Sequence, residues 1–583
     1  MVIICADIVA RNLLGASLPL VSELGALLLV MIVSLQLATT IRAERLARTD
    51  LFFVGLKASR PRIAALLSAF FNLVGAIIIG LIAYASIRIL GKDWASGDYI
   101  GIIGIATLPT WPFRALILAR HDDCRPRIHR SDDLRPPNSR DTRGKVMSPI
   151  EIGALATLGL LVLIYLGMPI GIGMLTVSFL GVAAIRGDVV SLRMMGQVAN
   201  DSLREYLFAV VPLFVLMGLL VTVSKVGKDT FDVFQQLLGR VTAGLGIATV
   251  FANAVFAAIT GISIASATVF SRVAVPEMKR HGYTRKFATG VVAGSSVLGM
   301  LIPPSLLMIV YAVLAEESVG RMFLAGVGPG ILLAVAFSIT IVLLARFRRD
   351  FVFTGAETGS SDEVMSGLGI ARKSLPILSL MLVVLGGLYG GFLNPTEAGA
   401  AGALGALVIA LMRRSLDPKS FWRLLLEAGQ ITVSVLFLIM AATFFSRMLA
   451  LSGVPNALAE VLLEGSIGPY GFLLIYLLLI IALGCLIDSI SIMLILLPIA
   501  LPIAEAAGFD LVWFGVLTVV AVEVGLLTPP FGLSVYIIKS AMDDPDLKVG
   551  EIFRGTLPFV GAMLVSIALI VVFPQIATWL ARL

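Results

Sequence analysis

Charge is scarce in this sequence. Asp, Glu, Lys and Arg make up 14% of its 583 residues, whereas 58% are hydrophobic, and the mean hydropathy is +1.00. A soluble protein of this length needs far more charge to cover its surface. The hydrophobic residues lie in many runs of about 18–25, the length that spans the ~30 Å hydrocarbon core of a bilayer. The sequence therefore predicts a polytopic membrane protein.

Cysteine and histidine are equally rare. The three cysteines are scattered and the three histidines fall in polar segments, so neither set predicts a metal cluster or a nucleophile–base pair. The sequence has no GxxxxGK[ST] phosphate loop, which excludes an ATPase of its own. Energy for pumping a solute would have to come from an ion gradient or a partner. The formal net charge of +7 is better explained by basic cytoplasmic loops than by nucleic-acid binding.

A polar, basic stretch at residues 120–147 divides the chain. Its composition and the pair Pro136-Pro137 give it no potential to span a membrane. A short apolar fragment begins the chain at Met1–Leu14, and a larger body follows the linker at 148–583. Three spanning segments are predicted between that fragment and the linker: Leu24–Ile41, Ile63–Ile87 and Tyr99–Ala119.

Two Pro-Pro pairs interrupt long apolar segments of the larger body. Pro303 and Pro304 end the run that starts at Gly299, and Pro529 and Pro530 end the matching run that starts at Gly525. Proline removes a backbone donor and clashes with the preceding helical turn, so each helix must break. Inside a bilayer, a broken backbone is tolerated only where protein buries it or where it lines a polar cavity. Matched breaks in two halves of a chain indicate the binding site of a transporter.

A predicted re-entrant hairpin precedes each Pro-Pro pair. The first has its tip at Thr260–Ser263 and the second at Asp488–Ser489. Ser263 precedes Pro303 by 40 residues, and Asp488 precedes Pro529 by 41. This spacing predicts two repeats at about 207–345 and 430–578. Two ordinary membrane crossings are an alternative to the first hairpin.

The flanking charges predict that the two repeats are inverted. Basic residues flank the first hairpin, whereas only acidic residues flank the second. Because Lys and Arg concentrate on the cytoplasmic side, the first hairpin should enter from the cytoplasm and the second from outside. The basic set is Lys225, Lys228, Arg240, Lys279, Arg280, Arg285 and Lys286, and the acidic set is Glu460, Glu464, Glu505 and Asp510.

Oxygen atoms at the tips and breaks are candidate sodium ligands, because an unwound helix offers carbonyls without a charged cage. The first candidate site comprises Thr260, Gly261, Ser263, Ser266, Gly299, Ile302 and Ser305, and the second comprises Asp488, Ser489, Gly525 and Thr528. The half-helix N-termini beyond Pro304 and Pro530 are predicted seats for a substrate carboxylate. Alternatively, any one Ser or Thr here only bonds the carbonyl four residues earlier.

Ionisable residues within apolar segments are costly and usually functional. Asp488 is therefore the strongest single candidate. Glu523 is either functional or holds its helix against a scaffold. Glu397, in Asn394-Pro-Thr-Glu, is predicted to cap the following helix, and Arg447 is predicted to anchor a helix end by snorkelling.

Six motifs mark the larger body: Pro276-Glu-Met, His281-Gly-Tyr, Leu298-Gly-Met-Leu-Ile-Pro-Pro-Ser305, Asn394-Pro-Thr-Glu-Ala398, Trp513-Phe-Gly515 and Glu523-Val-Gly-Leu-Leu-Thr-Pro-Pro530. Over about residues 148–583 they resemble the large membrane subunit of tripartite ATP-independent periplasmic (TRAP) transporters. Two further motifs, Asp7-Ile-Val-Ala-Arg11 and Leu18-Pro-Leu-Val-Ser-Glu23, make the front piece, 1–119, similar to the small membrane subunit of that family. The chain thus resembles a small–large fusion with residues 120–147 as its linker.

The resemblance implies a multi-pass transporter of the bacterial inner membrane and no enzymatic activity. Sodium would drive uptake of an organic acid, such as a C4-dicarboxylate or a sialic acid, delivered by a periplasmic binding protein. No cofactor is implied besides sodium as the coupling ion. The implied fold is all-α and elevator-type, with inverted repeats, two re-entrant hairpins, two broken helices and a small helical N-terminal scaffold domain.

The sequence departs from the family pattern in two places. The first tip reads Thr260-Gly-Ile-Ser263 where a Ser-Gly-Ser-type run is expected. The first small-subunit helix lacks its front half, so we expect a start roughly 15–25 residues upstream, or a defective copy. The side of the linker stays open, because the hairpin charges place Ser148 outside whereas a four-helix small subunit places the linker inside.

Three alternatives to this function remain from the sequence. One is an elevator-type carboxylate or ion transporter that needs no binding protein. Another is an intramembrane enzyme with Asp488 and Glu523 as a carboxylate pair. The last is an inactive small–large scaffold.

Overall fold

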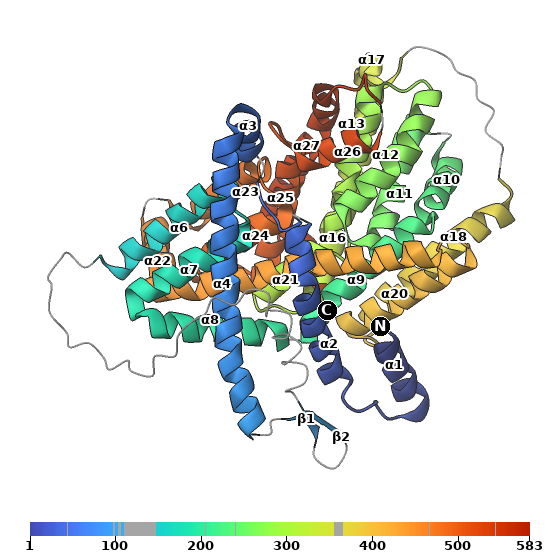
Figure 1. Ribbon diagram of the computed structural model, residues 1–583. Coiled ribbons are helices and arrows are strands. Elements are labelled where there is room, and N and C mark those ends of the chain that lie inside the picture. Colours follow the sequence, from blue (N-terminus) through green and yellow to red (C-terminus); the bar gives the residue numbers. More distant parts are fainter. Residues whose placement is uncertain are drawn as a thin grey trace, which may run out of the picture. The chain divides into compact units, whose positions relative to one another are not determined.

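The structure, a computed structural model, is dominated by helices (Figure 1). It describes residues 1–43, 45–49, 51–96, 99–102, 106–109, 147–204, 206–239, 241–354, 365–465, 467–542 and 544–582. Within these ranges, nine helices are long and apolar enough to cross a membrane, or ten if the bent pair Arg285–Leu301 and Leu306–Leu314 is one span. The predicted polytopic, helical class is therefore confirmed.

The predicted spanning helix at Tyr99–Ala119 is wrong over its first half. Strands β1 (Tyr99–Ile102) and β2 (Ala106–Pro109) pair there as an antiparallel ribbon. The β-branched isoleucines and the tyrosine of this stretch favour strand, a preference that the apolar character of the run does not reveal. The second half of the segment and the predicted linker lie outside the described residues, apart from their borders.

The described chain forms two compact units that cut across the sequence order. One unit contains Met1–Val21, Leu207–Val435 and Leu462–Leu583, and the other contains Ser22–Tyr206 and Leu436–Val461. The long helix α21 (Pro418–Ser452) contributes to both. The sequence division at 120–147 stays a prediction.

The unit built on Ser22–Tyr206 packs helices through small residues. A Cβ on Gly171 would lie 2.7 Å from the Phe437 ring, and a Cβ on Gly153 would lie 2.3 Å from the Ser452 hydroxyl. These glycines let α6 and α7 approach the end of α21, as small residues do in membrane helix packing. The helices are α2 (Val21–Arg42), α3 (Leu51–Ser59), α4 (Pro61–Ser96), α6 (Pro149–Tyr165), α7 (Ile170–Arg186), α8 (Asp188–Arg204) and α22 (Val454–Ala459).

Arg447 lies in this same unit. Its guanidinium pairs with the Asp201 carboxylate at 3.7 Å, and both side chains are exposed. An exposed pair of this kind contributes little to stability, so the predicted anchoring role stays a prediction.

The larger unit contains both predicted hairpins and both broken helices. Its first half has η2 (Tyr206–Ala209), α9 (Val210–Val223), α10 (Val226–Leu238), α11 (Gly244–Thr260), α12 (Ser263–Arg280), α13 (Arg285–Ser296), α14 (Leu298–Leu301), α15 (Leu306–Leu314), α16 (Val319–Phe347) and α17 (Arg349–Val352). Between the halves lie α18 (Gly367–Met381), η3 (Leu382–Gly386), α19 (Gly387–Tyr389) and α20 (Pro395–Met412). Its second half has η4 (Glu460–Glu464), α23 (Gly468–Gly484), α24 (Ser489–Ala506), α25 (Leu511–Leu527), α26 (Leu533–Ala541), α27 (Val549–Val572), α28 (Gln575–Thr578) and η5 (Leu580–Arg582).

Equivalent helices of the two halves of this unit pack reciprocally against the other half. Helix α12 of the first hairpin packs against α26 behind the second break, and α24 of the second hairpin packs against α15 behind the first. Likewise, α13 packs against the last span, α27, and α25 packs against α16. Repeats related by a pseudo-two-fold axis produce such reciprocal contacts. The inverted and re-entrant orientations themselves stay predictions.

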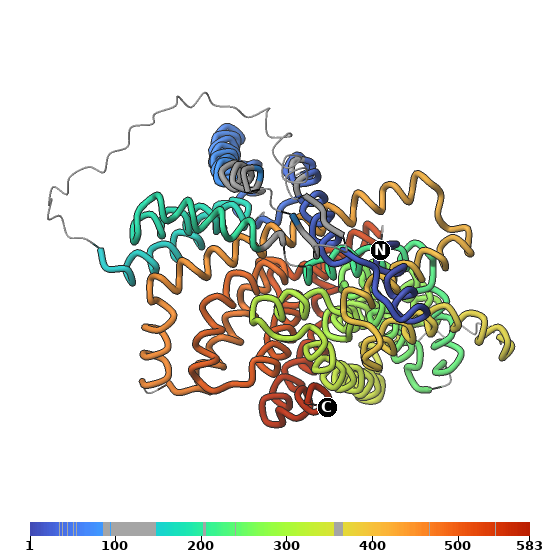
Figure 2. The backbone as a smooth tube through the Cα atoms, turned by 90° about the horizontal axis from the view of Figure 1, so that it is seen from below, coloured from blue at the N-terminus to red at the C-terminus, as the bar shows by residue number. Residues whose placement is uncertain are grey.

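The N-terminal helix α1 (Val2–Leu14) lies beside α20 (Figures 1 and 2). Ile4 joins Leu213 and Ala400 in one buried cluster. Arg11 forms two hydrogen bonds to Glu397, from Nη1 to Oε1 at 2.7 Å and from Nη2 to Oε2 at 2.9 Å. A bidentate ion pair and a cluster of buried apolar side chains thus both join α1 to residues almost 400 positions later in the sequence.

Candidate functional site

The tip of the first hairpin lies directly on the first Pro-Pro break. Helix α11 ends at Thr260, and its C-cap Gly261 has a φ of +62°, which lets the chain reverse into α12. A Cβ on Gly261 would lie 2.3 Å from the Pro304 carbonyl oxygen. The Leu306 amide donates to the Gly261 carbonyl at 3.3 Å. The structure therefore confirms that the first hairpin tip lies next to the first Pro-Pro break.

Two further glycines allow this close approach. A Cβ on Gly299 would lie 3.2 Å from Ser263 Cα, and a Cβ on Gly218 would lie 2.7 Å from the Thr260 carbonyl oxygen. Gly299 was a predicted site residue, whereas Gly218 on α9 was not. The sequence carried no signal for Gly218, because its role depends on a neighbour more than 40 residues away.

The break changes which backbone oxygens are bonded. In a continuous helix, Gly299 and Met300 would accept hydrogen bonds from residues 303 and 304, but proline has no N–H. The Ser305 hydroxyl replaces one of these donors by bonding the Met300 carbonyl. Ser305 also accepts from the Met308 amide at 3.3 Å and so caps α15. The Gly299 carbonyl lacks its helical donor, which fits the oxygen chemistry of a sodium ligand.

Three other predicted residues of the first site, Thr260, Ser266 and Ile302, have structural partners. The Thr260 hydroxyl donates to the Phe256 carbonyl, four residues earlier, at 3.1 Å. This local bond is the structural alternative to a sodium-ligand role. Ile302 packs against α16, because a Cβ on Gly330 would lie 2.7 Å from its side chain. Ser266 turns to the buried amide of Asn253 and donates to its Oδ1.

Asn253 is a polar centre that the sequence reasoning missed. It is fully buried, and its Nδ2 donates to the Ser295 hydroxyl at 2.5 Å. Through Ser266 and Ser295 it joins α12 and α13 to α11. A lone amide within the apolar run 244–260 was a signal that could have identified it, because buried amides need partners.

The tip of the second hairpin is organised by Asp488. Its Oδ2 accepts from the Ser491 amide at 3.1 Å, and its Oδ1 accepts from the Ser491 hydroxyl at 2.6 Å. Asp488 is thus the N-cap of α24. This structural role is one reason for an aspartate at this position. An N-cap carboxylate at a helix end can still accept a cation through its remaining lone pairs.

The second hairpin meets its broken helix through glycine and serine. A Cβ on Gly525 would lie 2.6 Å from Gly484 Cα, so α23 and α25 touch backbone to backbone. The Ser489 hydroxyl lies 3.4 Å from Glu523 Oε1 and donates to it. Thr528 is the C-cap of α25, and its hydroxyl donates to the Val524 carbonyl at 2.7 Å.

Glu523 is fully buried, and its Oε2 has no hydrogen-bond partner among the described residues. The carboxylates of Asp488 and Glu523 bond different tip serines, and no hydrogen bond joins them in the part of the chain that the structure describes. The carboxylate pair of the enzyme alternative is therefore not joined by a direct hydrogen bond among the described residues.

The two breaks differ in exposure. Pro303, Pro304 and Ser305 are buried, whereas the Phe531 side chain after the second Pro-Pro pair is 43% exposed. The first break is covered by its hairpin tip, and the second Pro-Pro turn is open within its unit. The two candidate sites are therefore not equivalent in access.

Glu397 has the capping role predicted for it. Its amide donates to Asn394 Oδ1 at 2.9 Å, and its Oε2 accepts from the Asn394 amide at 3.0 Å, which completes a capping box. The bond to Arg11 was not foreseen, because it joins distant parts of the sequence.

Comparisons with known proteins agree with the sequence motifs. The family of the tripartite ATP-independent periplasmic transporter, DctM component, matches residues 157–576, and the family of the DctQ component matches residues 1–119. The C4-dicarboxylate TRAP transporter large permease protein DctM of Pseudomonas aeruginosa is 33% identical over 392 residues, which are 66% of this chain and 89% of that protein.

Two other similarities concern a relative and a solved structure. The sialic acid TRAP transporter large permease protein SiaM of Vibrio cholerae is 31% identical over 429 residues, which are 73% of this chain and 97% of that protein. The crystal structure of the YdaH transporter of Alcanivorax borkumensis is 14% identical, with a TM-score of 0.49 over 75% of this chain and 99% of that one. With both component families matched in one polypeptide, the chain belongs to the tripartite ATP-independent periplasmic transporters, as a fused DctQ–DctM protein of the inner membrane.

Proposed function

We propose that this chain imports an organic acid across the inner membrane, driven by a sodium gradient and supplied by a periplasmic binding protein. Membership of the TRAP family supports the transport class. Named relatives carry C4-dicarboxylates and sialic acid, and others carry ectoine and isethionate. An organic acid is therefore the substrate class that we propose, without a choice among individual acids.

The contact between Gly261 and Pro304 is the observation that carries the proposal. It places a hairpin tip on a broken helix, the arrangement in which transporters hold ions and substrates. We propose that the backbone oxygens at Gly299 and Gly261, with the Ser263 hydroxyl, hold one sodium ion. The second proposed sodium site uses Asp488, Ser489 and the backbone around Gly525 and Thr528.

The half-helix N-termini of α15 and α26 are the proposed contacts for the substrate carboxylate. A helix N-terminus carries partial positive charge and unpaired amides, which favour an anion. The turn Pro529–Phe531, which precedes α26, is exposed. We further propose that the hairpin-bearing elements move as one body during transport, in an elevator mechanism.

Uptake by the purified chain in liposomes tests this function. We expect uptake of a labelled organic acid only when an inward sodium gradient and the cognate binding protein are both present. Uptake that persists without the binding protein would instead support the binding-protein-independent alternative. Uptake that ignores a sodium gradient but follows a potassium or proton gradient would overturn the sodium assignment.

A further inference from the structure

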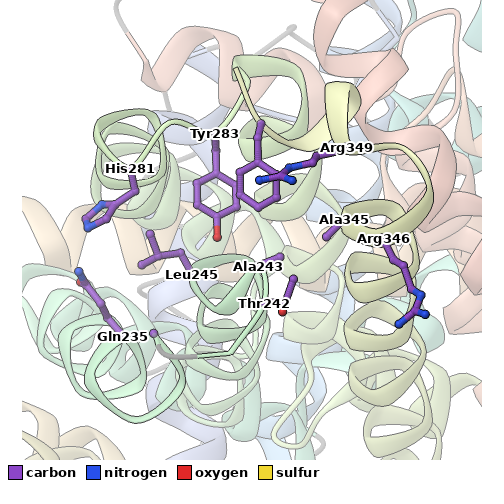
Figure 3. Close-up of a pocket in the computed structure, with 11 residues that line it drawn as sticks. Gln235, Thr242, Ala243, Leu245, His281, Tyr283, Ala345, Arg346 and Arg349 are labelled. Atoms are coloured by element: carbon purple, nitrogen blue, oxygen red, sulfur yellow. The ribbon is translucent and has the colours of Figure 1, made fainter. Parts of the chain in front are cut away.

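A pocket of about 510 Å³ lies at the end of α16, away from both candidate sodium sites. Four segments enclose it: the end of α10, the turn before α11, the turn between α12 and α13, and the end of α16 with α17. Figure 3 shows Arg346 and Arg349 on one side of the pocket and His281 and Gln235 on the other, with Tyr283 between them.

Backbone hydrogen bonds fasten the frame of this pocket. The Thr284 amide donates to the Val352 carbonyl at 2.9 Å, and the Thr354 amide donates to the Gly282 carbonyl at 2.8 Å. The rings of Tyr283 and Phe353 pack with their centroids 4.8 Å apart. The segment that carries Arg349 is therefore fixed to the turn that carries Tyr283.

The two arginines form the charged wall of the pocket. Neither the Arg346 nor the Arg349 guanidinium has a hydrogen bond or an ion pair in the described part of the chain. On the opposite side, the Glu277 carboxylate pairs with Arg280 at 3.4 Å and with His281 at 3.5 Å, and it accepts a hydrogen bond from Gln235 at 3.5 Å. Two arginines that line one side of a cavity, and that have no acidic partner among the described residues, favour an anion in that cavity.

Two residues with hydroxyl groups, Thr242 and Tyr283, also line the pocket. Tyr283 is 7% exposed, and burial raises the pKa of its hydroxyl to about 12, although a hydrogen bond with the Leu245 backbone opposes that rise. Tyr283 therefore stays neutral at physiological pH and adds no negative charge against an anion.

The charge pattern places the pocket on the cytoplasmic side. Arg346 and Arg349 follow the apolar span of α16, and Arg285 and Lys286 follow the turn that bears Tyr283. Clusters of Lys and Arg at helix ends mark the cytoplasmic surface, where anionic lipid headgroups also concentrate. Phe347, beside Arg346, is 73% exposed, as expected for a side chain at a lipid interface.

We propose that this pocket binds a phosphate group through Arg346 and Arg349, presented either by an anionic phospholipid or by a soluble phosphate compound. Guanidinium matches phosphate geometry with paired hydrogen bonds. The bound group would join the end of α16 to the cytoplasmic base of the first hairpin. This site is separate from the proposed route of the transported acid, so it does not depend on the proposed function.

Binding to the full-length chain in detergent tests the proposal. One arm compares sodium phosphate with sodium chloride at equal sodium concentration and ionic strength. The other compares dioctanoyl phosphatidylglycerol with dioctanoylglycerol, which has the same acyl chains but no phosphate. Thermal unfolding midpoints and microscale thermophoresis give the apparent affinity, and we expect a phosphate-dependent response in at least one arm.

The matched variants are R346Q/R349Q and R348Q. Arg348 lies between the two pocket arginines but does not line the pocket. We expect the double variant to weaken phosphate-dependent binding at least about tenfold, because charge-assisted bonds to phosphate are lost, and R348Q to bind as the wild type does. If the double variant does not purify as a folded protein, R346Q and R349Q alone are each expected to weaken binding more than R348Q.

The outcomes separate the two sources of phosphate. Tighter binding of phosphatidylglycerol than of inorganic phosphate assigns the site to a lipid headgroup, and equal or weaker binding assigns it to a soluble phosphate. Absence of phosphate-dependent binding in both arms overturns the proposal. Equal binding by the wild type and by the arginine variants overturns it as well.

Discussion

Gly484 on α23 and Gly525 on α25 touch backbone to backbone, because a Cβ on Gly525 would lie only 2.6 Å from Gly484 Cα. This contact seats the arm of the second hairpin against its broken helix. Any side chain at either position must push the two helices apart. The geometry of the second candidate site therefore requires glycine at both positions.

Gly525→Val should therefore destabilise the protein. Overpacking of a tight contact costs about 1–3 kcal/mol, and we expect a lower thermal unfolding midpoint in detergent together with reduced uptake. Gly561 on α27 is the control, because a Cβ there would meet nothing within 4 Å. Gly561→Ala should leave the midpoint unchanged or raise it slightly, and an equal loss in both variants would contradict the contact argument.

Asp488→Asn separates the capping role of this residue from its proposed ionic role. Asn and Asp cap helices about equally well, so the unfolding midpoint should stay near that of the wild type. If the carboxylate also binds sodium, its loss should raise the sodium concentration needed for half-maximal uptake. Asp488→Ala removes both roles and should cost more uptake than Ser263→Ala. An unchanged sodium dependence in Asp488→Asn would confine Asp488 to capping.

The Arg11–Glu397 pair should stabilise the larger unit more than an exposed pair does. The Glu397 side chain is 6% exposed, and Arg11→Met leaves its carboxylate without a cationic partner. We expect a loss of about 1.5–3 kcal/mol in unfolding free energy, the range for hydrogen bonds to charged groups. Arg11→Lys should recover only part of it, because lysine cannot form the bidentate bond.

The exposed pair Arg321–Glu317 provides the control for this measurement. Its atoms lie 3.3 Å apart, and the arginine side chain is 49% exposed. Arg321→Met should change the unfolding free energy by less than about 1 kcal/mol, as exposed pairs usually do. Similar losses for Arg11→Met and Arg321→Met would argue against a special contribution from α1.

Asn253→Leu should loosen the first hairpin. It removes the amide that joins Ser266 and Ser295 and leaves buried hydroxyls with fewer partners. Unsatisfied buried groups cost about 1–3 kcal/mol each, so we expect a lower unfolding midpoint and faster amide hydrogen exchange in α11 and α12. Ser338→Ala on α16, which breaks only a local bond to the Ala334 carbonyl, should change hydrogen exchange in α11 and α12 little.

Much of the fold followed from the sequence because its signals are local. Apolar runs define spans, and Pro303-Pro304 and Pro529-Pro530 define breaks, since a missing N–H acts within one helical turn. The hairpin tips near Ser263 and Asp488 were also predicted correctly as helix boundaries. The stretch from Tyr99 was misjudged, because an apolar run alone does not distinguish a spanning helix from a short ribbon.

The sequence alone determined the class of the protein, its broken helices and the family motifs, because each depends on residues that lie close together along the chain. Tertiary structure decided which oxygens are free. It showed that the hydroxyls of Thr260, Ser266 and Ser305 bond protein carbonyl or amide oxygens. It also showed that Asp488 caps the N-terminus of α24. Finally, it brought Arg346, Arg349 and Tyr283 together around one pocket. Hydrogen-bond partners and cavity walls come from segments far apart in sequence, so only the folded chain can place them.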